Sequence, residues 1–307
     1  MKLLPHGWLI LDKPRGLGST QAVGAVKRNL REGGYPKVKV GHGGTLDPLA
    51  QGVLPIALGE ATKLAGRMLD ASKVYDFTIR FGEETDTLDA EGEVVERSEV
   101  MPTDAELDDI LPRFTGPIEQ VPPAYSAVKV DGKRAYDRAR SGENVAMKVR
   151  SVAVHALTRG PGPRQGGEGH EVTLTAHVSK GTYIRSLARD ISRALGTVGH
   201  VTYLRRTRAG PFHERQAISL DKLNKIGQGA PLHQVLLPLE AGLDDIPALS
   251  LDPDSAQAVR QGRVLSDLPH PDGLHFAKLG NRPVALVELE GGTAKVVRGF
   301  NLPDVAE

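Results

Sequence analysis

The chain of 307 residues is 39% hydrophobic and 25% charged, the composition of a globular protein with room for two domains and a sizeable core. It contains no cysteine, so disulfides and cysteine-ligated metal centres are excluded and a cytoplasmic location is favoured. No apolar run approaches the length of a membrane span, and the first residues lack the apolar stretch of a signal peptide. We therefore expect a cytoplasmic protein without membrane association.

Charge is unevenly distributed along the chain. The net charge is +1, yet residues 121–215 contain 17 Lys and Arg against 7 Asp and Glu, which leaves −9 for the rest. Such a basic segment is typical of a local face that binds a polyanion. Solvated helix faces would produce the same excess, and the sequence supports the two interpretations about equally.

The first elements in chain order are short. The patterns predict a strand over 7–14, a helix over 19–31 capped by Ser19 or Thr20, a strand over 37–40 and a helix over 59–69. A glycine-rich loop over 41–50 holds the imidazole of His42, the hydroxyl of Thr45 and the carboxylate of Asp47 between buried segments. Such a loop is a common position for catalytic groups. The alternative is a turn in which Asp47 caps a backbone amide, and the loop by itself favours that alternative.

Residues 73–81 alternate between apolar and polar positions, which predicts a strand. Tyr75 stands at the start of its apolar face and alone on that face has a polar tip, so a buried Tyr75 hydroxyl would need a partner. A core tyrosine bonded to a backbone carbonyl is the plainer interpretation. Residues 82–92 lack the spacing of a calcium loop, and we interpret them as a turn whose side chains bond its own backbone.

The middle of the chain combines regular elements with a basic hairpin. Thr103 and Glu106 predict the capping box of a helix that ends near Phe114. Asp131-Gly132 is a strong hairpin-turn signal within a basic cluster of Lys129, Lys133, Arg134, Arg138 and Arg140. Beyond it the patterns predict paired strands over 149–158 and 171–179, a loop over 160–169, a helix from about 180 to 195 and a basic strand over 201–208.

Arg185 lies in the first turn of the predicted helix, where the helix dipole disfavours a cation. An anionic partner, either a carboxylate or an RNA phosphate, would compensate for that position. The alternative is that Arg185 extends into water, which costs only about a few tenths of a kcal/mol.

A small β-rich domain is predicted after a connecting stretch over 232–249. Its elements are a helix over 253–261 and strands over 274–279, 283–290 and 293–300. We therefore divide the chain into a larger domain over 1–248, with a basic insertion at about 121–150, and a second domain over 249–307. Residues 250–307 hold 8 acidic and 6 basic side chains, so the second domain is no obvious electrostatic anchor.

Several cofactor signatures are absent from the sequence. It has no phosphate-loop pattern, zinc-protease helix motif, serine-nucleophile elbow or dinucleotide fingerprint, and its 10 histidines do not fall at metal-ligand spacings. We expect no metal site and no cofactor.

Five segments occur in a fixed order over about residues 7–215. They are GWLILDKP (7–14), GHGGTLDPLA (41–50), KVY (73–75), TDTLDAEG (85–92) and SKGTYIR (179–185) with LRR (204–206). Together they resemble the bacterial tRNA pseudouridine-55 synthases of the TruB type. The resemblance implies an α+β fold in which helices flank a mixed, largely antiparallel central sheet. The C-terminal segment is more distantly similar to the PUA-like RNA-binding domain of that family.

The resemblance also implies roles for individual residues. Asp47 would be the nucleophile, Arg185 would pair with it, and Tyr75 would stack on the target uracil and is a candidate to take the proton from C5. Substrate-binding residues would be His42, Tyr75, Tyr183, Leu204, Lys13, Lys129, Lys133, Arg134, Arg205 and Arg206, with Lys13 as a support. Gly43 stands where a threonine is common in the family, which puts the stiffness of the loop in question.

The chemistry of the residues is compatible with this resemblance. Pseudouridine formation breaks the N-glycosidic bond, rotates the base and joins C5 to the sugar, which requires one carboxylate, at C1′ or at C6, and no cofactor. The base must first leave the RNA stack. We expect a stand-alone monomer that isomerises uridine 55 in the T arm of tRNA without guide RNA or partner protein. The alternatives are an RNA-binding or RNA-folding protein and a guide-RNA-dependent synthase.

Overall fold

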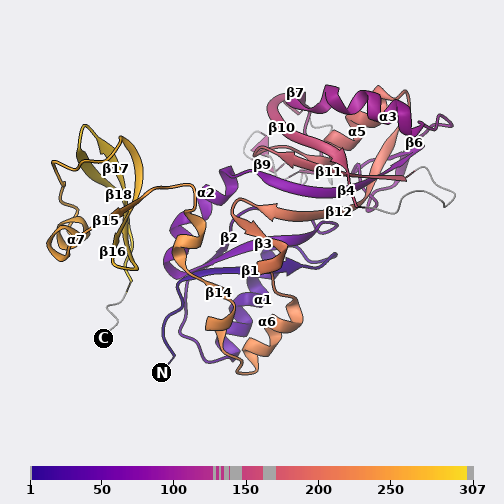
Figure 1. The fold of residues 1–307 in the computed structure, drawn as a ribbon. Coiled ribbons are helices and arrows are strands. Elements are labelled where there is room, and N and C mark those ends of the chain that lie inside the picture. The colour runs from indigo at the N-terminus through magenta and orange to yellow at the C-terminus, as the bar shows by residue number, and fades with distance from the viewer. Residues whose placement is uncertain are drawn as a thin grey trace.

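The computed structural model describes residues 2–126, 129–130, 133–134, 138, 147–161 and 171–302. Figure 1 shows a large curved sheet with helices around it and, beside it, a smaller β-rich domain that contains the C-terminal part of the chain. Two earlier expectations lie outside the described residues: the Asp131-Gly132 turn with Arg140, and most of the loop over 160–169.

The central sheet is mixed and largely antiparallel, as predicted. Its strands follow the order β14-β1-β3-β12-β4-β11-β10-β7, with β13 beside β12 and β2 beside β3. Among the described neighbours, β3 and β12 run parallel and the other pairs antiparallel. The bounds are β1 (Gly7–Lys13), β2 (Val40–His42), β3 (Gln51–Leu58), β4 (Lys73–Phe81), β7 (Gly116–Gln120), β10 (Arg150–Arg159), β11 (Glu171–Val178), β12 (Gly199–Ala209), β13 (Phe212–His213) and β14 (Leu236–Leu237).

Helices cover the sheet at both ends. α1 and α6 pack together at one end, and α3 and α5 lie at the other (Figure 1). The α-helices are α1 (Ser19–Glu32), α2 (Ala65–Asp70), α3 (Asp104–Ile110), α5 (Ile184–Ala194), α6 (Leu220–Gly227) and α7 (Pro253–Arg260). Short 3-10 turns are η1 (Gly59–Leu64), η2 (Leu111–Phe114), η3 (Glu214–Gln216), η4 (Leu232–Gln234) and η5 (Leu239–Gly242). None of the helices in the described part of the chain is long and apolar enough to cross a membrane.

Two small hairpins accompany the sheet. β5 (Glu83–Thr85) pairs with β6 (Val94–Arg97), so the segment predicted as a turn over 82–92 begins with a short strand. β8 (Lys129–Val130) pairs antiparallel with β9 (Lys133–Arg134), as the hairpin prediction requires of the strands that flank the turn.

The alternation of β4 sets which face of the sheet is buried. Phe77 and Ile79 are fully buried in the main core, which also contains Leu187 and Ile191 of α5. The opposite face near β1 buries Trp8 in a second cluster, where its indole nitrogen donates to the Leu239 carbonyl at 3.0 Å. The two faces therefore have separate cores, and the strands between them are fixed from both sides.

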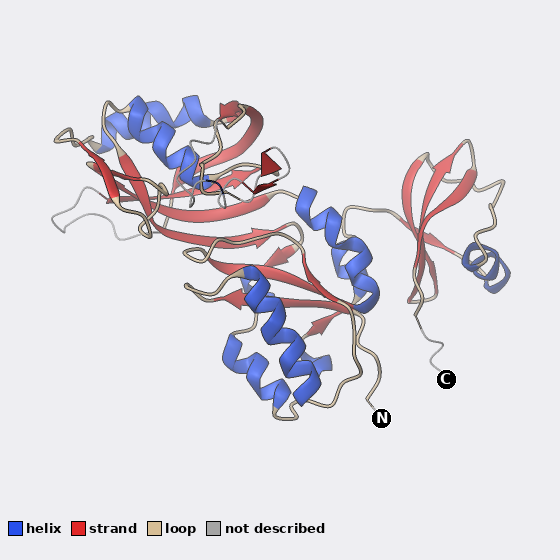
Figure 2. Cartoon of the chain, turned by 180° about the vertical axis from the view of Figure 1, so that it is seen from behind, coloured by secondary structure: helices blue, strands red, loops and turns tan. Residues whose placement is uncertain are grey.

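The C-terminal domain is a four-stranded sheet with one helix, which confirms the predicted β-rich domain. Its order is β15-β16-β17-β18, and the strands are β15 (Ala248–Ser250), β16 (Gly273–Leu279), β17 (Arg282–Glu290) and β18 (Thr293–Gly299). Phe276, Leu286 and Phe300 join the cluster around Trp8, so the domain packs on the central sheet through apolar side chains. Figure 2 shows the domain from behind, on the side of the sheet where α2 lies.

The predicted cap of α1 is wrong. The N-cap residue is Gly18, which has no side-chain cap, and its amide donates to Gln21 Oε1 at 2.8 Å. The Ser19 hydroxyl instead accepts from the Leu46 amide at 2.8 Å and donates to the Leu46 carbonyl at 2.9 Å. The Ser19 hydroxyl thus bonds Leu46 in the loop and does not cap its own helix. This contact fixes the loop that carries Asp47 to the start of α1.

Candidate active site

A pocket of about 610 Å³ opens where the loop after β2 meets β4, β12 and the connection between β11 and α5. It is lined by Gly44, Thr45, Leu46, Asp47, Ala50, Leu69, Lys73, Tyr75, Arg150, Val178, Ser179, Gly181, Thr182, Tyr183, Ile184, Arg185, Leu204 and Arg206. Six of the predicted site residues thus meet in one cavity, although they come from four separate segments of the sequence: Asp47, Tyr75, Tyr183, Arg185, Leu204 and Arg206.

The loop that carries Asp47 is held tightly. Gly44 adopts a φ of 137°, which a residue with a side chain rarely tolerates. Gly43 lies so near α2 that a Cβ would come within 2.7 Å of Met68 Cβ, which accounts for glycine at this position in this chain. The Asp47 side chain is nevertheless 42% exposed, so its carboxylate is accessible from the pocket.

Arg185 connects Asp47 to a second carboxylate. Its Nη2 lies 2.7 Å from Asp47 Oδ2, and its Nη1 lies 3.1 Å from Asp89 Oδ2. The same two nitrogens also donate to the backbone carbonyls of Tyr125 at 3.0 Å and Thr87 at 2.9 Å. The side chain is only 7% exposed, so of the alternatives for Arg185 the structure has the carboxylate partner and not the exposed cation.

Asp89 was not identified from the sequence. It lies in the turn over 82–92, where its Oδ1 accepts from the Thr87 hydroxyl at 2.6 Å and from the Glu91 amide at 3.0 Å. The prediction that this turn bonds its own backbone is confirmed. The sequence did not show that the second carboxylate oxygen of Asp89, Oδ2, faces Arg185 of α5. Leu88 beside it has a φ of 61°, which is unusual for a bulky residue.

Arg206 and Lys13 lie beneath the loop and not in contact with solvent. The Arg206 guanidinium, 1% exposed, donates to the carbonyls of Val53 at 2.8 Å, Gly44 at 3.1 Å and Thr45 at 3.3 Å. Lys13 Nζ donates to two carbonyls of its own segment, and burial lowers the pKa of Lys13 to about 8 against the opposing effect of Asp47. Arg206 therefore stabilises the loop directly, whereas Lys13 bonds the carbonyls of Pro14 and Leu17.

Two tyrosines and a leucine shape the wall of the pocket. The half-buried Tyr75 has its hydroxyl 3.5 Å from Arg206 Nη1, so the partner of the hydroxyl is a guanidinium. Tyr183 is positioned by Gln120, whose amide side chain accepts from the Tyr183 amide at 3.0 Å and donates to its carbonyl at 3.3 Å. Burial raises the pKa of Tyr183, which keeps its ring neutral. Leu204 is 6% exposed and provides an apolar surface.

His42 lies outside the lining of this pocket. Its Nδ1 accepts from the Gly44 amide at 3.4 Å, and burial together with Arg206 lowers the pKa of His42. The imidazole is thus neutral near pH 7 and supports the turn that precedes Asp47.

The remaining predicted contacts are peripheral to the pocket. Arg205 points to the other face of β12 and binds Asp12 through two bonds of 3.1 Å each. The side chains of Lys129, Lys133 and Arg134 lie outside the described residues. Arg150, by contrast, was not predicted, yet it is exposed at the pocket and forms no ion pair with any described residue.

Within the described residues, no three His, Asp or Glu side chains gather as a metal site would require. The expectation that no cofactor takes part stays a prediction, to be tested by chelation.

Comparison with solved structures defines the class of fold. A chain in the solved structure of an H/ACA RNP bound to a substrate RNA containing 2′-deoxyuridine aligns with a TM-score of 0.72 and 25% identity over 97% of this chain and 86% of that chain. The fold is thus that of a pseudouridine synthase: a mixed α+β central sheet and a β-rich C-terminal domain.

Sequence comparison then gives the family. Residues 31–184 match the "TruB family pseudouridylate synthase (N terminal domain)" and residues 185–244 the "tRNA pseudouridylate synthase B C-terminal domain". A protein named tRNA pseudouridine synthase B from Novosphingobium aromaticivorans is 68% identical over 98% of this chain and 99% of its own length. One of the same name from Zymomonas mobilis is 57% identical over 96% of both. The chain belongs to the TruB family of pseudouridylate synthases and is an isomerase.

Proposed function

We propose that the protein converts uridine 55 in the T arm of tRNA to pseudouridine, with Asp47 as the nucleophile. The observation that carries this proposal is the accessible Asp47 carboxylate, held at 2.7 Å by a buried Arg185 at the edge of a pocket of about 610 Å³. The names of the relatives support tRNA as the substrate.

The reaction requires the target base to leave the RNA stack and enter the pocket. Asp47 attacks either C1′ of the ribose or C6 of the uracil, and the N1–C1′ bond breaks. After the base rotates, C5 bonds to C1′ and the bond between Asp47 and C1′ or C6 breaks, which returns the carboxylate. C5 loses its proton and N1 gains one, so atoms and charge balance without an external reductant or oxidant. The pocket supports this sequence because it combines one accessible carboxylate with apolar and aromatic walls.

We assign the pocket residues accordingly. Tyr75 stacks on the uracil, and its hydroxyl is the candidate acceptor for the C5 proton. Tyr183 and Leu204 contact the rest of the flipped nucleotide. Arg185 is a positioning residue that holds Asp47, while His42 and Arg206 bond the loop at Gly44 and Lys13 holds the Leu17 carbonyl.

We further propose that residues 1–248 form the catalytic domain and 249–307 an RNA-binding domain. β15 begins at Ala248, so this boundary passes through the first residue of that strand. The basic insertion at about 121–150 is proposed to bind the phosphates of the T arm, and the enzyme is proposed to act as a monomer without cofactor.

A guide-RNA-dependent synthase is the second candidate, because the similar solved chain comes from an H/ACA RNP. One experiment separates the candidates. Purified protein alone is mixed with an unmodified tRNA transcript carrying tritium at uridine C5, and tritium release and the position of the modified base are measured. Release of one equivalent with modification at position 55 supports the proposal. No release without added RNA or protein partners would refute the stand-alone enzyme.

A further inference from the structure

A second pocket, of about 870 Å³, lies at the C-terminal end of α1. It shares no lining residue with the pocket at Asp47. Its walls come from the last turns of α1 and from the connection between α1 and β2: Lys27, Leu30, Arg31, Tyr35, Pro36, Lys37, Val38, Lys39 and Val40. Four of these nine residues are cationic and none is acidic, so the pocket has the charge of an anion-binding site.

The cations are not used by the fold. Lys27, Arg31, Lys37 and Lys39 are exposed, and none forms an ion pair or side-chain hydrogen bond with any residue that the structure describes. Residues 27–39 hold five basic side chains against one acidic side chain, an excess that lies outside the basic segment recognised in the sequence. These cations repel one another, and a bound polyanion would relieve that repulsion.

The floor of the pocket is apolar and rigid. The Tyr35 amide donates to the Leu30 carbonyl at 2.9 Å, and the Tyr35 hydroxyl accepts from the Leu232 amide at 2.9 Å. Lys2 Nζ lies 4.3 Å from the centre of the Tyr35 ring and donates to the Gly33 carbonyl at 2.6 Å. The carbonyl at the end of α1 is therefore bonded by Lys2 and not by a lysine of the pocket. The buried Leu30 and Val40 complete a preformed surface with cations at its edge.

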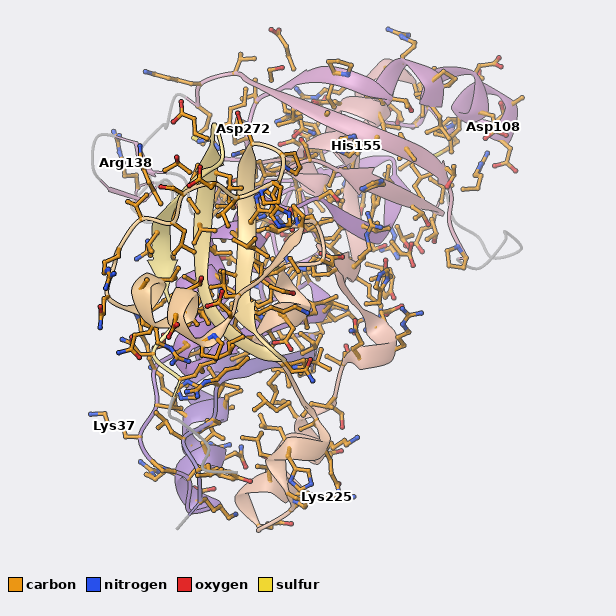
Figure 3. The ribbon with its side chains drawn as sticks, turned by 60° about the vertical axis from the view of Figure 1, so that its left-hand side comes forward. Lys37, Asp108, Arg138, His155, Lys225 and Asp272 are labelled. Carbon is orange, nitrogen blue, oxygen red and sulfur yellow. The ribbon has the colours of Figure 1, made fainter. Side chains whose placement is uncertain are left out.

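We propose that this pocket binds the sugar-phosphate backbone of the tRNA substrate at a position apart from the target uridine. A nucleotide fits because its phosphates can meet the lysines while its sugar and base cover the apolar floor. In Figure 3, Lys37 and Arg138 of the basic insertion both lie on the left-hand side of the molecule, Lys37 low and Arg138 high. The inference rests on the proposed tRNA substrate, but it does not depend on which group attacks the ribose or base.

The test compares two charge-matched variants of the full chain. Lys37→Gln/Lys39→Gln removes two cations of the pocket. Lys222→Gln/Lys225→Gln removes two exposed cations of α6, which packs on α1 but contributes no residue to the pocket. Both variants have the same net charge, so a non-specific electrostatic effect would weaken binding by both alike.

The measurements are the affinity for a tRNA transcript as a function of salt, and the single-turnover rate at saturating RNA. We expect the pocket variant to bind about tenfold more weakly near 0.1 M salt and to lower the log–log salt slope by about 1.5, at 0.7 to 0.9 per phosphate contact. The control variant should resemble the wild type, and both should keep the wild-type rate. An unchanged affinity and slope in the pocket variant, or an equal loss in both variants, would overturn the proposal. A wild type that binds tRNA but releases no tritium would contradict the proposed function instead.

Discussion

Replacement of Arg185 by lysine tests the most specific feature of the site. The guanidinium donates from Nη2 to Asp47 and from Nη1 to Asp89, and each nitrogen also reaches one backbone carbonyl. A lysine has one nitrogen with three donors and cannot take both positions of the planar fork. The variant therefore keeps the charge and loses either the bond to Asp47 or the bond to Asp89.

The expected effect follows from the burial of this contact. Arg185 is 7% exposed, and hydrogen bonds to charged groups contribute about 1.5 to 3 kcal/mol each. Because the Asp47 side chain is 42% exposed, water can replace part of the bond, so the fold survives. The position of the attacking oxygen does not survive, and we expect a loss of about two orders of magnitude in the chemical step, or about 2.7 kcal/mol.

The assay is the single-turnover rate with enzyme in excess of tRNA, together with tRNA affinity and the melting temperature of the same preparations. Arg193→Lys is the matched control, because Arg193 lies on the same helix and binds Glu84 at 3.0 Å without lining the pocket. The reasoning is refuted if Arg185→Lys turns over at the control rate, or if its whole defect is in RNA affinity, which would make Arg185 a phosphate contact.

Four further predictions use other contacts. Asp47→Asn should abolish turnover while tRNA binding stays within a few-fold, and a residual rate of a tenth of wild type would exclude Asp47 as the nucleophile. Asp89→Asn leaves Arg185 a neutral partner, so we expect about a tenfold lower single-turnover rate; an unchanged rate would mean that Asp47 alone fixes the arginine. Burial and, to a lesser extent, Arg206 lower the pKa of Lys73 from 10.5 to about 8. The charged Lys73 therefore lowers the free energy of unfolding below pH 8, and up to about 3 kcal/mol of that stability returns between about pH 8 and 10.5. The free energy of unfolding of the wild type should rise over that window relative to Lys73→Met, and parallel pH profiles would contradict this. Deletion of 250–307 should weaken tRNA binding and lower stability but preserve the rate at saturating RNA; a folded but inert truncation would contradict the proposed domain division.

The elements that the sequence predicted correctly are those whose residue pattern is contained in a single strand or helix. The alternation of 73–81 gave β4, and Thr103 with Glu106 forms the capping box at the start of α3, with the Thr103 amide 2.8 Å from Glu106 Oε2. These features depend on neighbours two to four residues away, so a single sequence contains them.

The contacts that hold the site could not be found in this way. Asp89 and Arg185 are far apart in the chain, and the bond of Ser19 to Leu46 replaces a local cap because the loop and α1 meet only in the folded protein. For Arg206 a signal was present: it shares the period-2 face of β12 with the apolar Leu204, whereas Arg205 faces the opposite way. Alternation thus separates the buried arginine from the one that pairs with Asp12.

The buried cations around the loop also explain how the pocket treats negative charge. An isolated buried cation costs several kcal/mol unless its donors are satisfied. Arg206, Lys13 and Lys73 are satisfied mainly by neutral carbonyls, and none of them forms an ion pair with a described carboxylate. The N–H donors of these side chains therefore have hydrogen-bond acceptors, but their positive charges are not neutralised by a carboxylate. Asp47, whose charge acts on Lys13, is bound by Arg185, and Asp70, whose charge acts on Lys73, is bound by Lys180. Positive charge therefore remains in excess behind the pocket. In the reaction that we propose, that excess favours negative charge at the pocket, including the charge that develops on the uracil as the glycosidic bond breaks.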